Sequence, residues 1–250
     1  MAWAGAGGGG LMAATLPTLG MGQVAVLLRG EPASIGPWIE RWQLRRVVFC
    51  MGVTIVGTGL YGAAMGWWRA PMQGFYAAIK FPLIILLTTL GNALLNGMLA
   101  PLLGINLRFR QSFLAILVSF TIAAAILGAF SPLVFFVVWN LPSLVPGAPI
   151  SPTTYLVFQL TQVGAIAFAG VAANWRLMQV LRSWSESNAV ASRVLLAWLA
   201  GNLFLGSQLS WILRPFIGSP HLPLQFLRPN AFEGNFFETV LQNVRHLISS

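Results

Sequence analysis

Five long apolar stretches dominate the chain, and most of its charged residues and prolines lie outside them, in the connecting segments and the two terminal regions. Each stretch is at least as long as the roughly 20 apolar residues that cross the ~30 Å hydrocarbon core of a bilayer as a helix. The pattern predicts an all-α fold, a polytopic transmembrane helical bundle of about five spans. The expected spans are Val47–Trp68, Ile79–Leu103, Phe113–Trp139, Tyr155–Val180 and Val190–Ile217.

The third stretch contains Pro132, which bears on the number of crossings. Proline removes a backbone donor and clashes with the preceding turn of a helix. We therefore expect a kink there, or a helix end near Phe130 followed by an interfacial segment, "PLVFFVVWN". An independent crossing by that segment would raise the count to six, but it is much shorter than a membrane span.

Residues 1–46 are expected to form an N-terminal tail and an interfacial anchor. The tail is rich in Gly and Ala and has no basic residue before Arg29, so it lacks the basic region of a secretory signal. Trp38, Trp42 and an arginine pair at 45 and 46 then precede the first span. Aromatic and basic residues at this position are typical of an anchor at the membrane surface.

Residues 218–250 follow the predicted bundle of residues 47–217 and are expected to be extramembrane or interfacial. Their last part predicts a C-terminal amphipathic helix, because apolar residues recur there at spacings of three and four. Such a helix lies on the membrane or docks against the bundle. The apolar positions are Phe236, Phe237, Val240, Leu241, Val244 and Leu247.

Small residues recur through the spans and predict closely packed helices, because small side chains let helix backbones approach each other in a bilayer. The first span carries a Gly-xxx-Gly pair, Gly62 and Gly66, and the third offers Ala124 with Gly128. The pattern is common in membrane bundles and indicates packing rather than a specific dimer face.

Composition strengthens the membrane assignment. Hydrophobic residues make up 57% of the 250 residues and charged residues 8%, with a mean hydropathy of +0.77, which is more apolar surface than one soluble core can hide. The formal net charge of +9 comes from thirteen Arg and one Lys against five Glu and no Asp. These basic residues flank the spans singly or in pairs, as topology signals do, so we expect no nucleic-acid partner.

The distribution of the basic residues predicts the orientation. With the N-terminus in the cytoplasm, nine of the fourteen lie on the cytoplasmic side, as the positive-inside rule favours. The loop between the third and fourth spans, "NLPSLVPGAPISPTT", has no charge, which suits an exported loop. We therefore predict a multi-pass protein of the bacterial inner (cytoplasmic) membrane, with the N-terminus cytoplasmic and the C-terminus outside.

The chain lacks the residues that most membrane enzymes use. No Glu and no His lies within a predicted span, and Cys50 is the single cysteine. This argues against proton coupling, haem or di-iron ligation, and thiol-based metal or redox centres. There is no Asp for an aspartate-based metal site and no intramembrane His to activate a serine. We predict a non-enzymatic protein with no catalytic residues, no cofactor and no metal.

A few polar side chains inside the spans are the candidate contacts. Asn92 and Asn96 are four residues apart and share one face of the second predicted helix, so both can reach a neighbouring helix. Asn202 and Gln208 are candidates on the fifth. In one interpretation these amides form interhelical hydrogen bonds of ~0.6 kcal/mol each on average. In the other they line a small polar cavity for a headgroup or solute, because intramembrane polar groups are costly unless satisfied.

Lys80 and Arg214 complete the candidate site residues. The predicted topology places both near the non-cytoplasmic surface, and Pro82 is expected in the first turn of the helix that Lys80 enters. Long cationic side chains there usually snorkel to lipid phosphates. In a second interpretation the two cations together bind an anionic headgroup or a carboxylate. For Lys80 that carboxylate would be Glu233 or Glu238 on the C-terminal helix.

Two motifs give the chain a resemblance to a known family. The helix entered by "YAAIKFPLIILLTTLGNALLNGMLAPLLG" and the following "FRQSFLAILVSFTIAAAILGAFSPLVFFV" resemble bacterial Yip1-like membrane proteins over about residues 60–217. Tyr76, Lys80, Pro82 and Gln111 with its neighbouring serine carry most of the similarity. The resemblance implies five spans, a cytoplasmic N-terminus, binding of small GTPases and other membrane proteins, and no catalytic activity.

These observations lead to two functional hypotheses. The first is a non-enzymatic integral membrane protein that binds membrane lipids or other membrane-protein subunits, as a subunit or assembly factor of a larger complex. The alternative is a small permease or lipid carrier with a polar path between the second and fifth helices. Copurifying partners in stoichiometric amount favour the first, and a lone particle with a hydrated internal cavity favours the second.

Overall fold

The structure, a computed structural model, describes residues 21–29, 39, 42–99, 109–144, 151–185, 187–219 and 222–249. Every regular element within these ranges is a helix, which confirms the predicted all-α fold. Five of the helices are long and apolar enough to cross a membrane, as in a multi-pass membrane protein. The helices are α1 (Met21–Arg29), α3 (Leu44–Gly66), α4 (Pro71–Leu99), α5 (Phe109–Asn140), α6 (Pro152–Trp184), α7 (Asn188–Leu213) and α8 (Phe236–Ser249).

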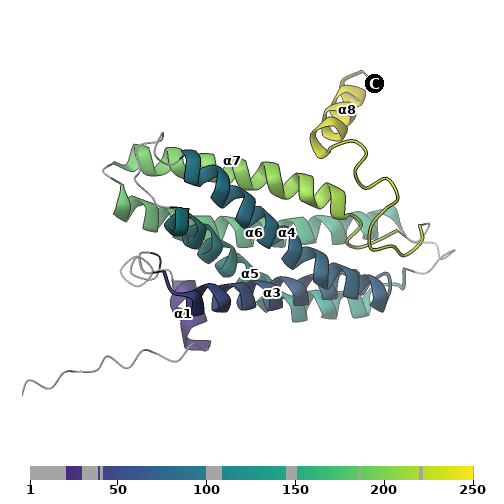
Figure 1. Cartoon of the computed structure of the whole chain (residues 1–250). Helices are drawn as coiled ribbons and strands as arrows, with labels where there is room; N and C mark the ends of the chain where they lie inside the picture. Colours follow the sequence, from purple (N-terminus) through teal and green to yellow (C-terminus); the bar gives the residue numbers. More distant parts are fainter. Residues whose placement is uncertain are drawn as a thin grey trace, which may run out of the picture.

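Consecutive long helices run in opposite directions, so the ends of α3, α5 and α7 lie at one end of the bundle with the starts of α4 and α6 (Figure 1). Hydrogen bonds tie this end together. Trp68 Nε1 donates to the carbonyl of Pro142 at 3.0 Å, and Arg69 Nη1 donates to the carbonyl of Leu144 at 2.9 Å. We call this end, at the right in Figure 1, the Arg69 end of the bundle.

Pro132 does not divide the third span. The helix α5 continues through Pro132 to Asn140, so the predicted end near Phe130 is wrong and no sixth crossing arises within the described ranges. Proline leaves the carbonyl four residues earlier, on Gly128, without its usual helical donor. Ser131 Oγ donates to that carbonyl at 2.7 Å and replaces the missing bond. Neighbouring hydroxyls commonly satisfy backbone groups freed by proline in membrane helices.

The N-terminal region is more closely attached to the bundle than predicted. The helix α1 lies within the expected tail, and its Leu27 is buried in the core cluster that also contains residues of α5. Within the predicted anchor, Trp42 contacts Phe113 at 6.2 Å between ring centroids and lies under the guanidinium of Arg110. Trp38 and residues 1–20 lie outside the described ranges.

The predicted amphipathic helix at the C-terminus is present as α8, and local side chains define where it begins. Asn235 Oδ1 accepts a hydrogen bond from the backbone N–H of Glu238 at 2.7 Å, which satisfies one of the free donors of the first turn. Glu238 also places a negative charge at the positive end of the helix dipole. The helix stands away from the long helices over most of its length (Figure 1).

Close backbone contacts join the central helix α3 to α4 and α5. A Cβ added at Gly62 would lie 2.6 Å from the carbonyl oxygen of Ala77, and one at Gly66 would lie 2.7 Å from that of Gln73. On the other side of α3, a Cβ added at Gly57 would overlap the carbonyl oxygen of Ala124. Because lipid is as apolar as the side chains, such close packing is a main source of helix association in a bilayer.

The contact between α3 and α5 gives a direct test. Gly57→Ala should destabilise the bundle by about 1–3 kcal/mol, the usual range for overpacking, because the clashing Ala124 oxygen belongs to the backbone and moves only with α5. Gly52→Ala in the same helix is the control, since an added Cβ there meets nothing within 4 Å. Thermal unfolding in detergent measures both variants. Equal midpoints for Gly57→Ala and the unsubstituted protein would refute the packing.

Candidate functional site

Three asparagines join α4 to α7 inside the bundle. Asn92 Nδ2 donates to Asn202 Oδ1 at 2.6 Å and to the carbonyl of Trp198 at 3.0 Å. Asn96 Nδ2 donates in turn to Asn92 Oδ1 at 2.7 Å. Both Asn92 and Asn96 are buried. We call Asn96, Asn92 and Asn202 the amide row.

The amide row agrees with the first interpretation of Asn92 and Asn96, in which the amides form interhelical hydrogen bonds. Both N–H groups of Asn92 and its oxygen have protein partners, so this side chain has little left to offer a guest. The opposing helix is shaped to fit the row, because a Cβ on Gly201 would overlap Asn92 Oδ1. The row therefore holds α4 and α7 in register.

Lys80 lies deeper than the sequence predicts. Because α4 begins at Pro71, Lys80 is nine residues into the helix, about 13 Å along its axis, and Pro82 lies in the helix interior rather than in the first turn. The Lys80 side chain is 0% exposed, which rules out the expected snorkelling. Its Nζ donates to the carbonyl of Pro215 at 2.9 Å and lies 5.1 Å from the ring centroid of Phe226. No described carboxylate, including Glu233 and Glu238, pairs with it.

Polar side chains hold the segment after α7 across the Arg69 end of the bundle. We call residues 214–219 the strap. Besides Lys80, Gln73 Nε2 donates to the carbonyls of Pro215 at 2.9 Å and Phe216 at 2.8 Å, and Arg69 Nε donates to that of Ser219 at 3.1 Å. These carbonyls follow the end of α7 and have no helical N–H donor, so the side-chain donors satisfy them, as buried irregular backbone requires.

The strap also turns sharply at Gly218. Its φ of +87° is a conformation that favours glycine, and an added Cβ would lie 3.2 Å from Arg69 Cγ. The Gly218 carbonyl accepts a hydrogen bond from Tyr155 Oη at 3.1 Å, which links the strap to the start of α6. The strap is therefore held by side chains of three different segments.

A cavity of about 550 Å³ lies beneath the strap, between α4, α6 and α7, and we call it the α4–α6–α7 cavity. Its volume is within the range of sites that hold small ligands. The wall that α6 contributes is exposed at Gln159, Val163 and Ile166, so the cavity is open to the surroundings along this helix. The residues with polar side chains in its wall include Thr88, Gln162, Asn202, Ser210, Arg214 and Arg228.

One buried polar group in the cavity wall has no partner. Thr88 is 2% exposed, and its Oγ1 makes no hydrogen bond. It faces α7 at Gly206, where an added Cβ would lie 3.7 Å from Thr88 Oγ1. By contrast, Gln162 Oε1 accepts a hydrogen bond from Tyr61 Oη at 2.7 Å. A buried hydroxyl left unpaired is costly, so Thr88 marks a place where a guest oxygen or a water would be stabilised.

Positive charge gathers at the strap end of the cavity. Arg214 follows the last residue of α7, and its guanidinium lies 3.2 Å from the centroid of the Trp211 ring. Burial and, second, the positive charge of Arg228 lower the pKa of Arg214 from its ordinary value. Arg214 and Arg228 both line the cavity, and no described carboxylate does.

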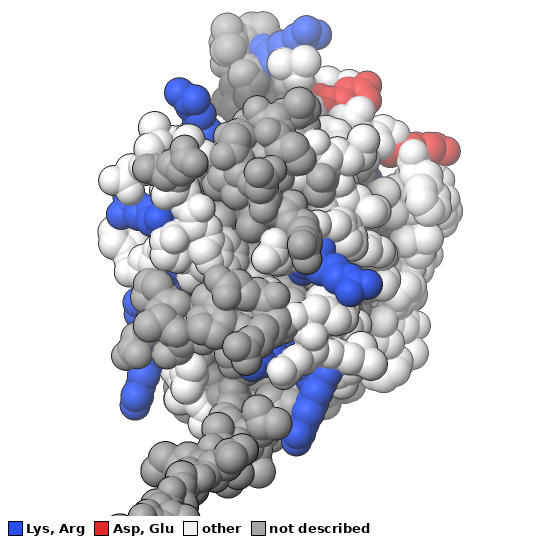
Figure 2. Space-filling view, turned by 60° about the vertical axis from the view of Figure 1, so that its left-hand side comes forward, with Lys and Arg blue, Asp and Glu red and all other residues white. Residues whose placement is uncertain are grey.

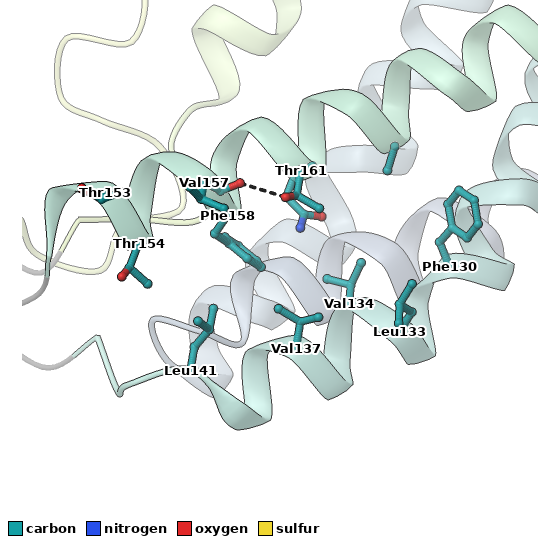
Figure 3. A pocket seen from close by; sticks show the side chains of 12 residues that line it. Phe130, Leu133, Val134, Val137, Leu141, Thr153, Thr154, Val157, Phe158 and Thr161 are labelled. Carbon is teal, nitrogen blue, oxygen red and sulfur yellow. Dashed lines mark hydrogen bonds between the residues drawn. The ribbon is translucent and has the colours of Figure 1, made fainter.

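A second hollow of about 560 Å³ lies between α5 and α6, and its wall is almost entirely apolar. Figure 3 shows Val134 and Val137 of α5 below Phe158 of α6, with Phe130 of α5 to the right. The hydroxyl of Thr161 donates to the carbonyl of its own helix at Val157, at 2.8 Å. Gln162 borders both this hollow and the α4–α6–α7 cavity. With no charged group in its wall, the second hollow suits hydrocarbon alone.

Gln208 serves a different purpose from the one expected. It does not line the cavity, and its Oε1 accepts a hydrogen bond from the backbone N–H of Phe236 at 3.2 Å, at the first residue of α8. Phe204 stacks on Phe237 beside it, with ring centroids 5.4 Å apart. Gln208 thus fixes the start of α8 to α7.

Sequence reasoning brought out Lys80, the amide row and Arg214 but missed other members of the site. Thr88 looked like one threonine in an apolar run, and Arg228 lay in a segment outside the predicted bundle. Tyr155 stood at a predicted helix start. Their common feature, a polar group in the wall of one cavity, becomes visible only when the antiparallel order of the helices is known.

Comparisons of the chain with protein-family models, with curated proteins and with solved structures found no match. The resemblance to Yip1-like proteins therefore stays a prediction, and the functional argument depends on the site itself. Among the residues placed in the structure, no group of three or more His, Cys, Asp and Glu side chains could hold a metal ion.

The amide row predicts a measurable coupling between two helices. In a double-mutant cycle, Asn92→Ala and Asn202→Ala should show a coupling of about 0.6–1.7 kcal/mol, the range measured for interhelical hydrogen bonds in a bilayer. Asn174→Ala is the matched control, because Asn174 Nδ2 donates only to the carbonyl of Gly170 in its own helix. Unfolding free energies in mixed micelles supply the numbers. Additive effects for Asn92 and Asn202 would argue against the row.

Proposed function

We propose that the protein is a non-enzymatic integral membrane protein that binds a membrane lipid in the α4–α6–α7 cavity. The observation that carries the proposal is the cavity itself, about 550 Å³ of space open along α6 with an unpaired buried hydroxyl in its wall. A lipid reaches such a cavity from the bilayer without crossing water. The apolar walls suit its chains, and the polar groups fix its orientation.

The arrangement of α4 and α7 favours binding over passage. The asparagines between these helices bond to one another, and the open volume lies beside them, toward α6. A through-path for a solute would need polar groups that remain free along the contact between the two helices. The permease hypothesis receives less support from this geometry than the lipid-binding one.

A second candidate is a subunit of a larger membrane complex, and the exposure of α8 favours it. This helix stands away from the bundle (Figure 1), and its Phe237 and Leu241 are 40% and 51% exposed. Apolar side chains of a projecting amphipathic helix suit a partner protein or the membrane surface.

For orientation we propose a cytoplasmic N-terminus and an external C-terminus in a bacterial inner membrane. The end of the bundle opposite the Arg69 end carries Arg45 at the start of α3, Arg182 at the end of α6 and Arg193 near the start of α7. Figure 2, turned to bring that side forward, shows the basic side chains as separate groups. Scattered cations at helix ends are what the positive-inside rule describes.

The orientation is testable with fused reporters. A reporter that works only in the cytoplasm should signal when it is inserted before Val47 and stay silent when it follows Ser250, because five crossings place the two fusions on opposite sides. The C-terminal fusion, paired with a reporter that works only outside, provides the reciprocal control. A cytoplasmic C-terminus would show that the count of five crossings is wrong.

Lipid binding is testable by filling the cavity. Gly206 lines it, and an added Cβ there would meet only the Thr88 side chain, at 3.7 Å, so the larger side chain of Gly206→Leu should take up cavity space and reduce the lipid retained per chain at least severalfold. Gly164→Leu is the matched control, since an added Cβ on this α6 residue meets nothing within 4 Å and it lines neither hollow. Native mass spectrometry from mild detergent counts the bound lipids.

The same spectra distinguish the candidates. About one tightly bound lipid on the unsubstituted protein and on Gly164→Leu, but not on Gly206→Leu, supports the proposal. Equal retention by all three proteins contradicts it. A second polypeptide in stoichiometric amount, lost when residues 236–250 are removed, supports the subunit candidate instead.

A further inference from the structure

We propose that the lipid of the α4–α6–α7 cavity is an anionic amphiphile, whose headgroup lies between Arg214 and Arg228 and whose acyl chain lies along α6 and α7. The inference rests on the proposed function and adds the class of ligand. It follows from four features of the cavity: the geometry of the two arginines, the lack of an opposing charge, the hydroxyls beneath them and the length of the wall.

Contacts with Trp211 hold the guanidinium of Arg214 in place, so that its N–H groups can donate to a ligand in the cavity. The guanidinium stacks on Trp211, and Nη1 donates to the Trp211 carbonyl at 3.0 Å. Stacking fixes the plane of the guanidinium and leaves its other in-plane N–H groups available. A planar fork of this kind matches the oxygens of a phosphate or carboxylate.

Arg228 supplies the second cation from outside the helices. It is half-buried in the cavity wall, and its carbonyl accepts the N–H of Ala231 at 3.1 Å in the turn that follows. Lys80 adds a third positive charge nearby, because its partner Pro215 is the residue next to Arg214. Cations gathered at one end of a cavity repel one another, and an anion bound among them relieves that repulsion.

The described residues supply no such anion. The glutamates among them, Glu233 and Glu238, do not line the cavity, and Glu238 is engaged with Asn235 at the start of α8. An anionic group from the ligand would relieve the repulsion, and a zwitterionic headgroup would do so less well because it brings a cation with it. This asymmetry predicts a preference among lipids of equal chain length.

Below the arginines the cavity continues as a long wall. Asn202 lies in α7 and Arg214 directly follows that helix, so the twelve residues between them correspond to about 18 Å. Ser210 lies one turn below Arg214, and the unpaired hydroxyl of Thr88 lies further in. These hydroxyls can donate to ester oxygens beneath a headgroup, and the apolar side chains of Ile85 and Val163 can cover the hydrocarbon.

The experiment compares headgroups on the delipidated full chain in detergent. The probes are dioleoyl phosphatidylglycerol, dioleoyl phosphatidylcholine and inorganic phosphate, and native mass spectrometry or calorimetry measures binding. We expect phosphatidylglycerol to bind about tenfold or more tightly than phosphatidylcholine, since a charge-assisted hydrogen bond contributes that much. Inorganic phosphate should bind weakly, because it lacks a chain.

Variants assign the effect to the two arginines. Arg214→Gln and Arg228→Gln should each reduce the preference for phosphatidylglycerol about tenfold, and Arg228→Glu should abolish it. Arg182→Gln is the matched control, an exposed arginine at the opposite end of the bundle, and should leave the preference unchanged. Thermal unfolding of each variant establishes that it is folded, and Arg228 variants remain informative if Arg214 variants unfold.

Three results would overturn the inference. Equal binding of the two lipids, both blocked by Gly206→Leu, removes the anionic headgroup but leaves the proposed function intact. Binding of neither lipid removes the proposed function and the inference together. Binding of inorganic phosphate as tight as that of phosphatidylglycerol and unaffected by Gly206→Leu indicates an anion site with no place for an acyl chain.

Discussion

Within the hydrocarbon core every polar group needs a partner inside the protein, and the rest of this structure depends on that requirement. It explains how α5 accommodates Pro132, since the hydroxyl of Ser131 donates to the carbonyl that proline leaves free. It also explains the strap, where Arg69, Gln73 and Lys80 donate to backbone carbonyls after α7 has ended. Lys80, a candidate binding group in the sequence, therefore serves at least in part to satisfy a backbone carbonyl.

The same requirement makes a buried polar group without a partner, such as the hydroxyl of Thr88, informative. Several buried polar atoms of the described residues lack a partner, among them Gln73 Oε1, Trp198 Nε1 and Trp211 Nε1. Of these atoms, Thr88 Oγ1 is the one that belongs to the wall of the α4–α6–α7 cavity, which Arg214 and Arg228 also line. The helices pack closely around α3, in contrast to the open cavity between α4, α6 and α7. Gly57, Gly62 and Gly66 bring α3 into backbone contact with its neighbours, while α4, α6 and α7 leave about 550 Å³ between them. In the α4–α6–α7 cavity, open space and an unpaired buried hydroxyl occur together.

The sequence predicts the spans well because their apolar length is a one-dimensional property. All five expected stretches overlap the long helices α3 to α7, and four-residue spacing correctly placed Asn92 and Asn96 on a shared face. The sequence misplaces Lys80 because a proline after it predicts the first turn of a helix, whereas α4 begins at Pro71 and contains Pro82 in its interior. Arg228 and Tyr155 could not be assigned, since their roles arise from a chain that folds back across the bundle.

The position of Gln162 links the two hollows on either side of α6. Its side chain forms part of the wall of both hollows, and Tyr61 from α3 holds its oxygen at 2.7 Å, so the amide is pinned from within the bundle. Tyr61 thus restrains a side chain that both hollows share. A change in the rotamer of Gln162 would therefore alter the shape of both hollows at once.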